Sequence, residues 1–340
     1  MKTIWTGLAG AVAAIGLSAF AGPAFAETYK LKMSIDTAPA HHRTIVVVKW
    51  LDLLKKESGG QLDIELFHSA QLFNDLNVGR AIRQGSVDMA MPGNWVLGGI
   101  DSNNDLFLLP MFYGIPQEKM YAVSDGRVGA AIDKSLEEKL RVKVIGRWLD
   151  HGYSDTHSTG TPLKTSTDVK GLRVRSFGGA GTDVRIKMLG GDPVLVPWAD
   201  VPMGLSQGNF GALFSTANSV ASSKLWEAGV KHTLVDHEFF HQYIPMISQA
   251  AYDKLPPTLQ KLIVDSWEKN IDAYRAETGA AQKQALDVLA KHGVAVVTPS
   301  EAELAAVRQQ LMASQEELIK TLKIDPALAA SARADLKIDE

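Results

Sequence analysis

The sequence predicts an α/β fold of two lobes joined by a long helix. Three observations predict it. Strands and helices alternate from residue 29 to residue 91, the same alternation begins again near residue 169, and one amphipathic segment runs uninterrupted from about 258 to 288. An alternating order of strands and helices is typical of a parallel sheet covered by helices. At about 150 residues per domain, a chain of 340 residues has room for two such units.

Residues 1–26 have the layout of a secretory signal peptide. Lys2 precedes an apolar run from Ile4 to Phe20, and Ala24-Phe25-Ala26 matches the small-residue pattern before a cleavage point. The alternative is a membrane anchor, but a spanning helix needs about 20 apolar residues, and Gly22-Pro23 interrupts this run. We therefore expect an exported, periplasmic protein whose mature chain begins at Glu27. The absence of cysteine fits an oxidising compartment.

The first half of the mature chain reads as strand, helix, strand, helix, strand. Polar and apolar residues alternate at 29–35 and 62–67, which is the period of a strand. Ile45, Val48 and Leu51 lie at helical spacing between these two strands, and Gly59-Gly60 ends that helix. The predicted elements are strands at 29–35, 62–67 and 87–91 and helices at 40–58 and 74–84.

The second half repeats the theme and ends in helices. Its predicted elements are strands at 143–148, 169–175, 194–197 and 294–297 and helices at 182–189, about 258–288 and 301–322. A helix of about 30 residues spans about 45 Å, which is longer than one lobe, so it should brace both. We expect residues 27–150 plus about 240–275 to form the first lobe. Residues 151–239 plus about 276–340 should form the second.

A weak internal similarity connects the two halves. Each has a Gln-Gly turn, at Gln84-Gly85 and at Gln207-Gly208, followed by a short apolar strand and a small polar loop with an asparagine. These asparagines are Asn94 and Asn218. In open α/β sheets ligands bind at the carboxyl ends of strands. Two such loops that face each other predict a cleft, which a hinge motion can close.

Composition excludes several classes of function. The formal net charge is −3, so no basic excess exists to neutralise nucleic-acid phosphates. Without cysteine, thiolate catalysis, iron–sulfur clusters and cysteine-bound zinc are impossible. No phosphate-binding loop, dinucleotide fingerprint or serine nucleophile motif is present, and the glycines at 178–181 lack the required spacing. We expect neither a cofactor nor a metal.

The chain resembles the periplasmic solute receptors of tripartite ATP-independent periplasmic (TRAP) transporters over most of residues 27–325. The order and spacing of five motifs carry this resemblance: 58–62 with 69–72, 84–89, 168–175, 189–194 and 255–260. The resemblance implies a two-lobe periplasmic-binding-protein (Venus-flytrap) fold and binding without catalysis. It also implies a small carboxylate ligand and membrane-embedded transporter subunits as partners. We expect a monomer.

Arg175 is the strongest candidate for a ligand contact. It ends the predicted strand that follows the Lys170-Gly171 turn, at the edge where the cleft should lie. A guanidinium is a rigid fork of donors that matches a carboxylate. In the resembled family, the arginine at this motif position binds the ligand carboxylate. The alternative is a surface ion pair. We interpret the nearby Arg173 as structural or solvent-facing.

The remaining candidates come from predicted loops and strand ends. Asn218 and Ser215 lie on a second-lobe loop where the resembled family often has an asparagine that binds the same carboxylate. This chain has Gly211-Ala212 in place of the family's usual acidic-Gly pattern, so the assignment can shift by three residues, and we favour Asn218 over Ser215. An indole can line an apolar pocket or pack in the core. Loop solvation is the simple alternative for the polar candidates of the first lobe. The other candidates are Trp198, Asn94, Trp95, Asp36, His41 and Gln71.

Asp155 departs from the resembled family, many members of which have a second arginine twenty residues before the carboxylate-binding one. A carboxylate in the cleft would repel a second carboxylate on the ligand, by about 4 kcal/mol at ~4 Å and an effective dielectric near 20. We therefore expect a monocarboxylate or a zwitterion. The alternative is that Asp155 points to solvent.

His237-Glu238-Phe239-Phe240-His241 matches the H-E-x-x-H pattern of zinc peptidases and suggests an alternative function, an exported zinc hydrolase. That chemistry needs both histidines on one face of a helix. Pro245 follows within four residues and would break a continuing helix. No third ligand stands in a recognisable motif. We therefore favour the receptor.

Overall fold

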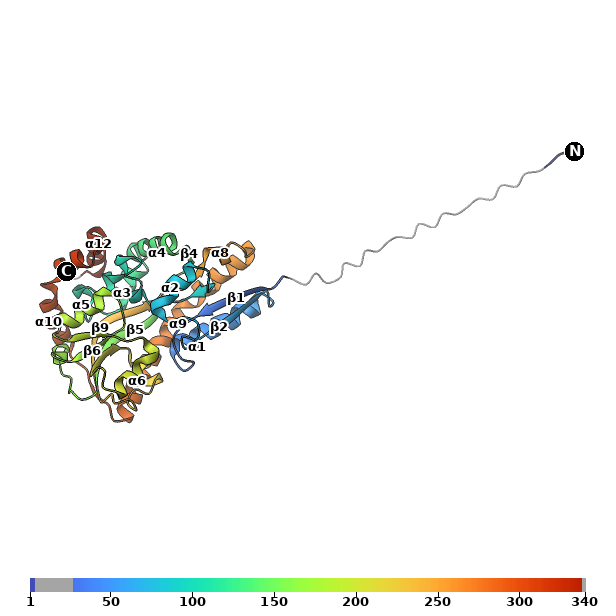
Figure 1. Cartoon of the computed structure of the whole chain (residues 1–340). Coiled ribbons are helices and arrows are strands. Elements are labelled where there is room, and N and C mark those ends of the chain that lie inside the picture. Colours follow the sequence, from blue (N-terminus) through green and yellow to red (C-terminus); the bar gives the residue numbers. More distant parts are fainter. Residues whose placement is uncertain (4–26, 338–340) are drawn as a thin grey trace.

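The computed structural model describes residues 1–3 and 27–337. Most of the predicted signal peptide lies outside the described residues. Among the described helices, none is both long and apolar enough to cross a membrane. The described chain forms two sheets with helices packed on them, as predicted (Figure 1).

The first sheet contains the strands predicted in the first half of the chain. Strand β1 (Tyr29–Ser34) pairs in parallel with β2 (Leu62–Phe67) and β3 (Met89–Ala90). Strand β10 (Met246–Ser248) runs antiparallel between β3 and β4 (Val142–Val144). Its helices are α1 (His42–Glu57), α2 (Asp75–Arg83), α3 (Gln117–Ser124), α4 (Arg127–Leu140) and α8 (Gln249–Tyr252).

The second sheet has the order β11-β9-β5-β8-β6-β7. Its centre is an antiparallel pair of long strands, β5 (Leu149–Ser158) and β9 (His232–Tyr243). The last residue of β9, Tyr243, also forms a bridge with Gly93 of the first lobe, so this pair connects the lobes. The shorter elements are β6 (Arg173–Ser176), β7 (Asp192–Leu195), β8 (Ala212–Ser215), β11 (Ala295–Val297), α5 (Ala180–Met188), α6 (Val201–Ser206) and α7 (Ala217–Ser222).

The predicted bridging helix is α9 (Pro257–Lys291), which contains 35 residues. Proline is favoured in the first turn because its missing N–H would have no partner there. The helix packs against α1 of the first lobe and against α7 and β5 of the second. Trp267 lies edge-on to Trp50 of α1, with ring centroids 5.0 Å apart. Near its middle, Arg275 donates to the Trp148 carbonyl, just before β5. The helix therefore braces both lobes.

The C-terminal helices differ from the expected division into lobes. The sequence boundaries put residues 276–340 in the second lobe, but α10 (Glu301–Met312) contacts residues 110–112, and α12 (Pro326–Leu336) contacts α3 and α4. The buried apolar side chains of α12 and of α11 (Gln315–Thr321) join the core of the first lobe. The single helix predicted at 301–322 is also interrupted near Ser314.

A buried ion pair of the second lobe also forms a hydrogen bond to the first lobe. Arg185 of α5 donates to Glu238 of β9, with 2.9 Å between Nη1 and Oε2, and its Nη2 donates to the carbonyl of Leu108 in the first lobe. The two side chains are 1% and 0% exposed. Pairing offsets the cost of removing both charges from water, because either charge alone would keep most of its desolvation penalty.

Asp105 is a second buried charge, and it lacks an ion-pair partner among the described residues. It lies in a short 3-10 segment (Ser102–Leu108), is 3% exposed, and its Oδ1 has no hydrogen-bond partner. Burial raises the pKa of Asp105 to about 7. Between about pH 4, near the ordinary pKa, and pH 7, the folded chain therefore holds a proton that the unfolded chain has released. The free energy of unfolding falls as pH rises through this range.

Replacing Asp105 by asparagine should therefore stabilise the protein at pH 8, by roughly 1 to 2 kcal/mol, because the neutral amide avoids the cost of a buried charge. The stability of the variant should also depend less on pH between 4 and 7. Urea unfolding at several pH values measures both effects. Asp52→Asn, at an exposed position of α1, is the matched control. Equal pH profiles for Asp105→Asn and the unmodified chain would contradict this prediction.

Candidate functional site

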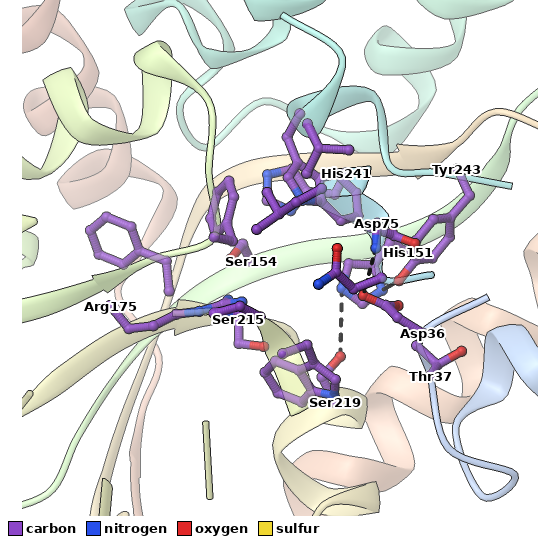
Figure 2. A pocket seen from close by; sticks show the side chains of 18 residues that line it. Asp36, Thr37, Asp75, His151, Ser154, Arg175, Ser215, Ser219, His241 and Tyr243 are labelled. Atoms are coloured by element: carbon purple, nitrogen blue, oxygen red, sulfur yellow. Dashed lines mark hydrogen bonds between the residues drawn. The ribbon is translucent and has the colours of Figure 1, made fainter. Parts of the chain in front are cut away.

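A cavity lies where the first lobe meets the face of the second sheet (Figure 2). Its volume is about 50 Å³, counted as the space that the centre of a water-sized sphere can reach. One water needs about 10–15 Å³ in that measure, so a compact ligand fits. The cavity is lined by Asp36, Thr37, Asn74, Asp75, Leu76, Trp95, Val96, His151, Ser154, Arg175, Phe177, Pro197, Trp198, Phe214, Ser215, Ser219, His241 and Tyr243.

Arg175 brings a buried positive charge to this cavity. Its Nε donates to the carbonyl of Val196 at 2.9 Å, which fixes the side chain, and its guanidinium lies 5.5 Å from the ring centroid of Trp198. The residue is 5% exposed, and no carboxylate among the described residues lies within ion-pair distance of it. Burial lowers the pKa of Arg175 to about 10, which still leaves it charged at neutral pH. A buried guanidinium without a counterion favours an anionic ligand.

Acidic residues lie at the opposite side of the cavity, but they already form ion pairs with an arginine. Arg43 of α1 donates to Asp36 at 2.9 Å and to Asp75 at 3.0 Å, and its guanidinium lies 3.9 Å from the ring centroid of Tyr243. Burial raises the pKa of Asp75 to about 7, although Arg43 opposes this shift. This network orients hydrogen-bonding groups toward the cavity without leaving a free positive charge there.

Aromatic and histidine rings form the wall between these two ends. Trp95 stacks on His151, with centroids 5.3 Å apart, and packs against His241 at 4.4 Å. Tyr243 lies within hydrogen-bond distance of His151, with 3.1 Å between its hydroxyl and Nδ1. Burial lowers the pKa of both histidines, that of His241 to about 3. Both rings are therefore neutral at physiological pH and can donate and accept hydrogen bonds.

The structure brings five of the predicted site residues together in this cavity. They are Arg175, Ser215, Trp198, Trp95 and Asp36. Arg175 and Ser215 come from β6 and β8, which neighbour each other in the second sheet, and Asp36 follows the first strand of the other lobe. The cavity therefore forms only when both lobes contribute.

Four other predicted residues do not line the cavity. Asn218 accepts a hydrogen bond from the backbone N–H of His42, and His41 caps α1 and approaches Ser219 to 3.0 Å, so both side chains serve contacts between α1 and α7. Asn94 is 1% exposed, and its Oδ1 accepts a hydrogen bond from the N–H of Gln242. Gln71 is exposed in a turn. Of the two alternatives on the second-lobe loop, Ser215 is the one that reaches the cavity.

The expected role of Asp155 does not agree with its position. Asp155 lines a second cavity of about 210 Å³, on the other side of β5, together with Tyr153 and His237. Successive side chains of a strand point to opposite faces, so its neighbour Ser154 is the residue that reaches the first cavity. The position of Asp155 therefore does not support the expected repulsion of a second ligand carboxylate.

The zinc-hydrolase alternative is not supported. His237 and His241 lie in strand β9, not in a helix. A register shift near Ser154 and a positive φ of 49° at His237 mark a bulge. The two imidazoles consequently face different cavities, and Glu238 pairs with Arg185. Among the described residues, no cluster of three metal-ligating side chains is present.

Sequence reasoning missed several residues of the cavity. His151, Ser154 and His241 come from the long pair β5–β9, and Asp75 and Tyr243 come from segments distant from Arg175 in the sequence. The polar residues at 150–158 could have indicated a buried strand with functional side chains, because nine successive positions combine strand formers with histidine, serine and aspartate.

These features define a class of protein. Two α/β lobes, connected by long strands and a bridging helix, enclose a cavity that offers an uncompensated cation; this is the architecture of a solute-binding protein. The chain belongs to the bacterial extracellular solute-binding proteins of family 7, whose family model matches residues 33–321. Members of this family bind substrates and are not enzymes.

Known proteins similar to this chain agree with that assignment. The 2,3-diketo-L-gulonate-binding periplasmic protein of Escherichia coli is 28% identical over 283 residues, covering 83% of this chain and 85% of that protein. The fold matches the galactonate complex of the sugar acid binding protein of Advenella mimigardefordensis, with a TM-score of 0.84, 16% identity and coverage of 92% and 99%. It also matches a succinate-bound TRAP solute-binding protein of Sulfurospirillum deleyianum, with a TM-score of 0.81, 17% identity and coverage of 91% and 99%.

Proposed function

We propose that this protein captures a small organic acid in the periplasm and delivers it to the membrane subunits of a TRAP-type transporter. In this proposal, Arg175 binds the ligand carboxylate. The observation that carries the proposal is the buried guanidinium of Arg175, which faces the cavity without a carboxylate partner among the described residues.

The surroundings of Arg175 support the same role. Its Nε bond to Val196 leaves the two terminal nitrogens for a bidentate contact. Ser215 can add a neutral donor to the same anion, since both residues line the cavity. The names of relatives support an acid as ligand: the Escherichia coli relative is named for 2,3-diketo-L-gulonate, and a Rhodobacter capsulatus relative, 25% identical over 311 residues, for C4-dicarboxylates.

Calorimetry and thermal unfolding of the periplasmic protein test this function. We expect at least one acid among pyruvate, 2-hydroxybutanoate, succinate and glucuronate to bind and to raise the midpoint of unfolding. A ligand at a hundredfold its Kd adds about 2.7 kcal/mol of stability. Tryptophan fluorescence should change on binding, because Trp95 and Trp198 line the cavity. Equal stabilisation by 1-butanol or butylamine, or no binding of any acid, would contradict the proposed function.

A further inference from the structure

Two buried polar atoms of the cavity lack partners. Ser154 is fully buried, and its Oγ forms no hydrogen bond with any described residue. His241 is 3% exposed, and its Nε2 also has no hydrogen-bond partner in the described part of the chain. Both side chains line the cavity that Arg175 lines. Buried polar atoms are almost always hydrogen-bonded, so two unpartnered ones in a single cavity need a partner that a ligand would supply.

The two side chains lie on neighbouring strands and on one face of the sheet. In the pair β5–β9, Gly152 is opposite His241 and Ser154 is opposite Phe239, so Ser154 and His241 are diagonal neighbours. Diagonal neighbours are about 7–8 Å apart, within reach of long side chains, so one ligand atom can lie between the hydroxyl and the imidazole. Arg175 lies on β6, which β8 separates from β5, and its side chain reaches the same cavity (Figure 2). Its charge is close enough to contribute to the lowered pKa of His241.

The chemistry of the two groups identifies the atom they would bind. A neutral imidazole and a serine hydroxyl can each donate or accept a hydrogen bond. An oxygen satisfies both of them, as a hydroxyl or a carbonyl, whereas a methylene group would leave both unpaired. An ammonium group fits less well, because the adjacent Arg175 is positively charged and Asp36 and Asp75 already share Arg43.

We infer that Ser154 and His241 select ligands with an oxygen on the carbon next to the carboxylate. This inference rests on the proposed function, because it takes the carboxylate of the ligand to lie on Arg175. The carbon that follows this carboxylate then lies toward β5 and β9, where the two unpartnered atoms are. The ligand class is thus the compact 2-hydroxy and 2-oxo acids. Ser154 and His241 are specificity residues, distinct from the arginine that binds the charge.

The decisive experiment compares acids that differ in a single oxygen. We expect calorimetry to give 2-hydroxybutanoate and 2-oxobutanoate a lower Kd than butanoate, by about ten- to hundredfold. 3-Hydroxybutanoate, with the oxygen one carbon farther from the carboxylate, should lack most of this advantage. Equal Kd values for butanoate and 2-hydroxybutanoate would overturn the inference and leave the proposed function standing. Failure of every acid to bind would overturn both.

Variants assign the selectivity to the two side chains. His241→Phe keeps a ring that can pack against Trp95 but removes both nitrogens, and Ser154→Ala removes only the hydroxyl. Each should reduce the preference for 2-hydroxybutanoate over butanoate, measured as the ratio of the two Kd values, by about tenfold. His237→Asn is the matched control: it removes a histidine of the same strand that faces the second cavity, and asparagine tolerates its positive φ. An unchanged preference in both folded variants, judged by circular dichroism, would overturn the assignment.

Discussion

Replacing Arg175 by alanine should weaken binding of the preferred acid about a hundredfold, or roughly 3 kcal/mol. The alanine variant loses the charge-assisted contact and leaves the ligand carboxylate buried among Trp95, Phe177 and Trp198. Arg175→Lys should also bind poorly, because an ammonium group lacks the planar fork of donors. Calorimetry with the tightest-binding acid of the panel gives both values.

The neighbouring arginine provides the control for this prediction. Arg173 lies two residues earlier on the same strand but is exposed. Arg173→Ala changes the net charge equally and should leave the Kd within about twofold, since exposed charges are screened by salt. If Arg175→Ala and Arg175→Lys both kept the affinity of the unmodified protein, Arg175 would not belong to the binding site.

Replacing Arg185 by methionine should have the largest effect on stability, a loss of roughly 3 to 5 kcal/mol in the free energy of unfolding. Arg185 holds Glu238 in a place where neither side chain meets water. Burial already raises the pKa of Glu238, and without the guanidinium only the interaction with Ser166 would oppose that effect. Because the folded state would then hold a proton that the unfolded chain releases, the deficit should grow as pH rises. Urea unfolding at pH 5 and pH 8 measures it.

The double variant Arg185→Met with Glu238→Leu separates the buried charge from simple loss of packing. It should recover most of the stability, because apolar residues of similar volume can replace a buried ion pair at little cost. Lys261→Met, which breaks the exposed pair with Asp265, should cost no more than about 0.5 kcal/mol. A double variant as unstable as Arg185→Met alone would contradict this account of the pair.

Local sequence patterns predicted the strands and helices that have one face toward the core and the other toward solvent. Strands β1 and β2 and helix α1 alternate between core and solvent, and α9 carries a continuous apolar face with Ile263 and Ile271. The long pair β5–β9 was not predicted as such, because its strands are buried on both faces and carry polar residues that pair with each other, such as Thr156 with Asp236. Polar and apolar residues therefore do not alternate along β5 and β9, so the usual sequence pattern of a strand is missing there.

The sequence by itself determined the two-lobe α/β class, the bridging helix and the family resemblance, and it indicated Arg175 as the candidate ligand contact, because these depend on local periodicity and on motifs within short segments. Only the tertiary structure decided which neighbours join Arg175. Ser154 and Asp155 are consecutive residues, yet their side chains face different cavities. His237 and His241 also face different cavities, because of the bulge at His237. Strand pairing between β5 and β9, whose partners are 74 to 94 residues apart along the chain, sets these directions. Such register depends on long-range packing that no local pattern encodes.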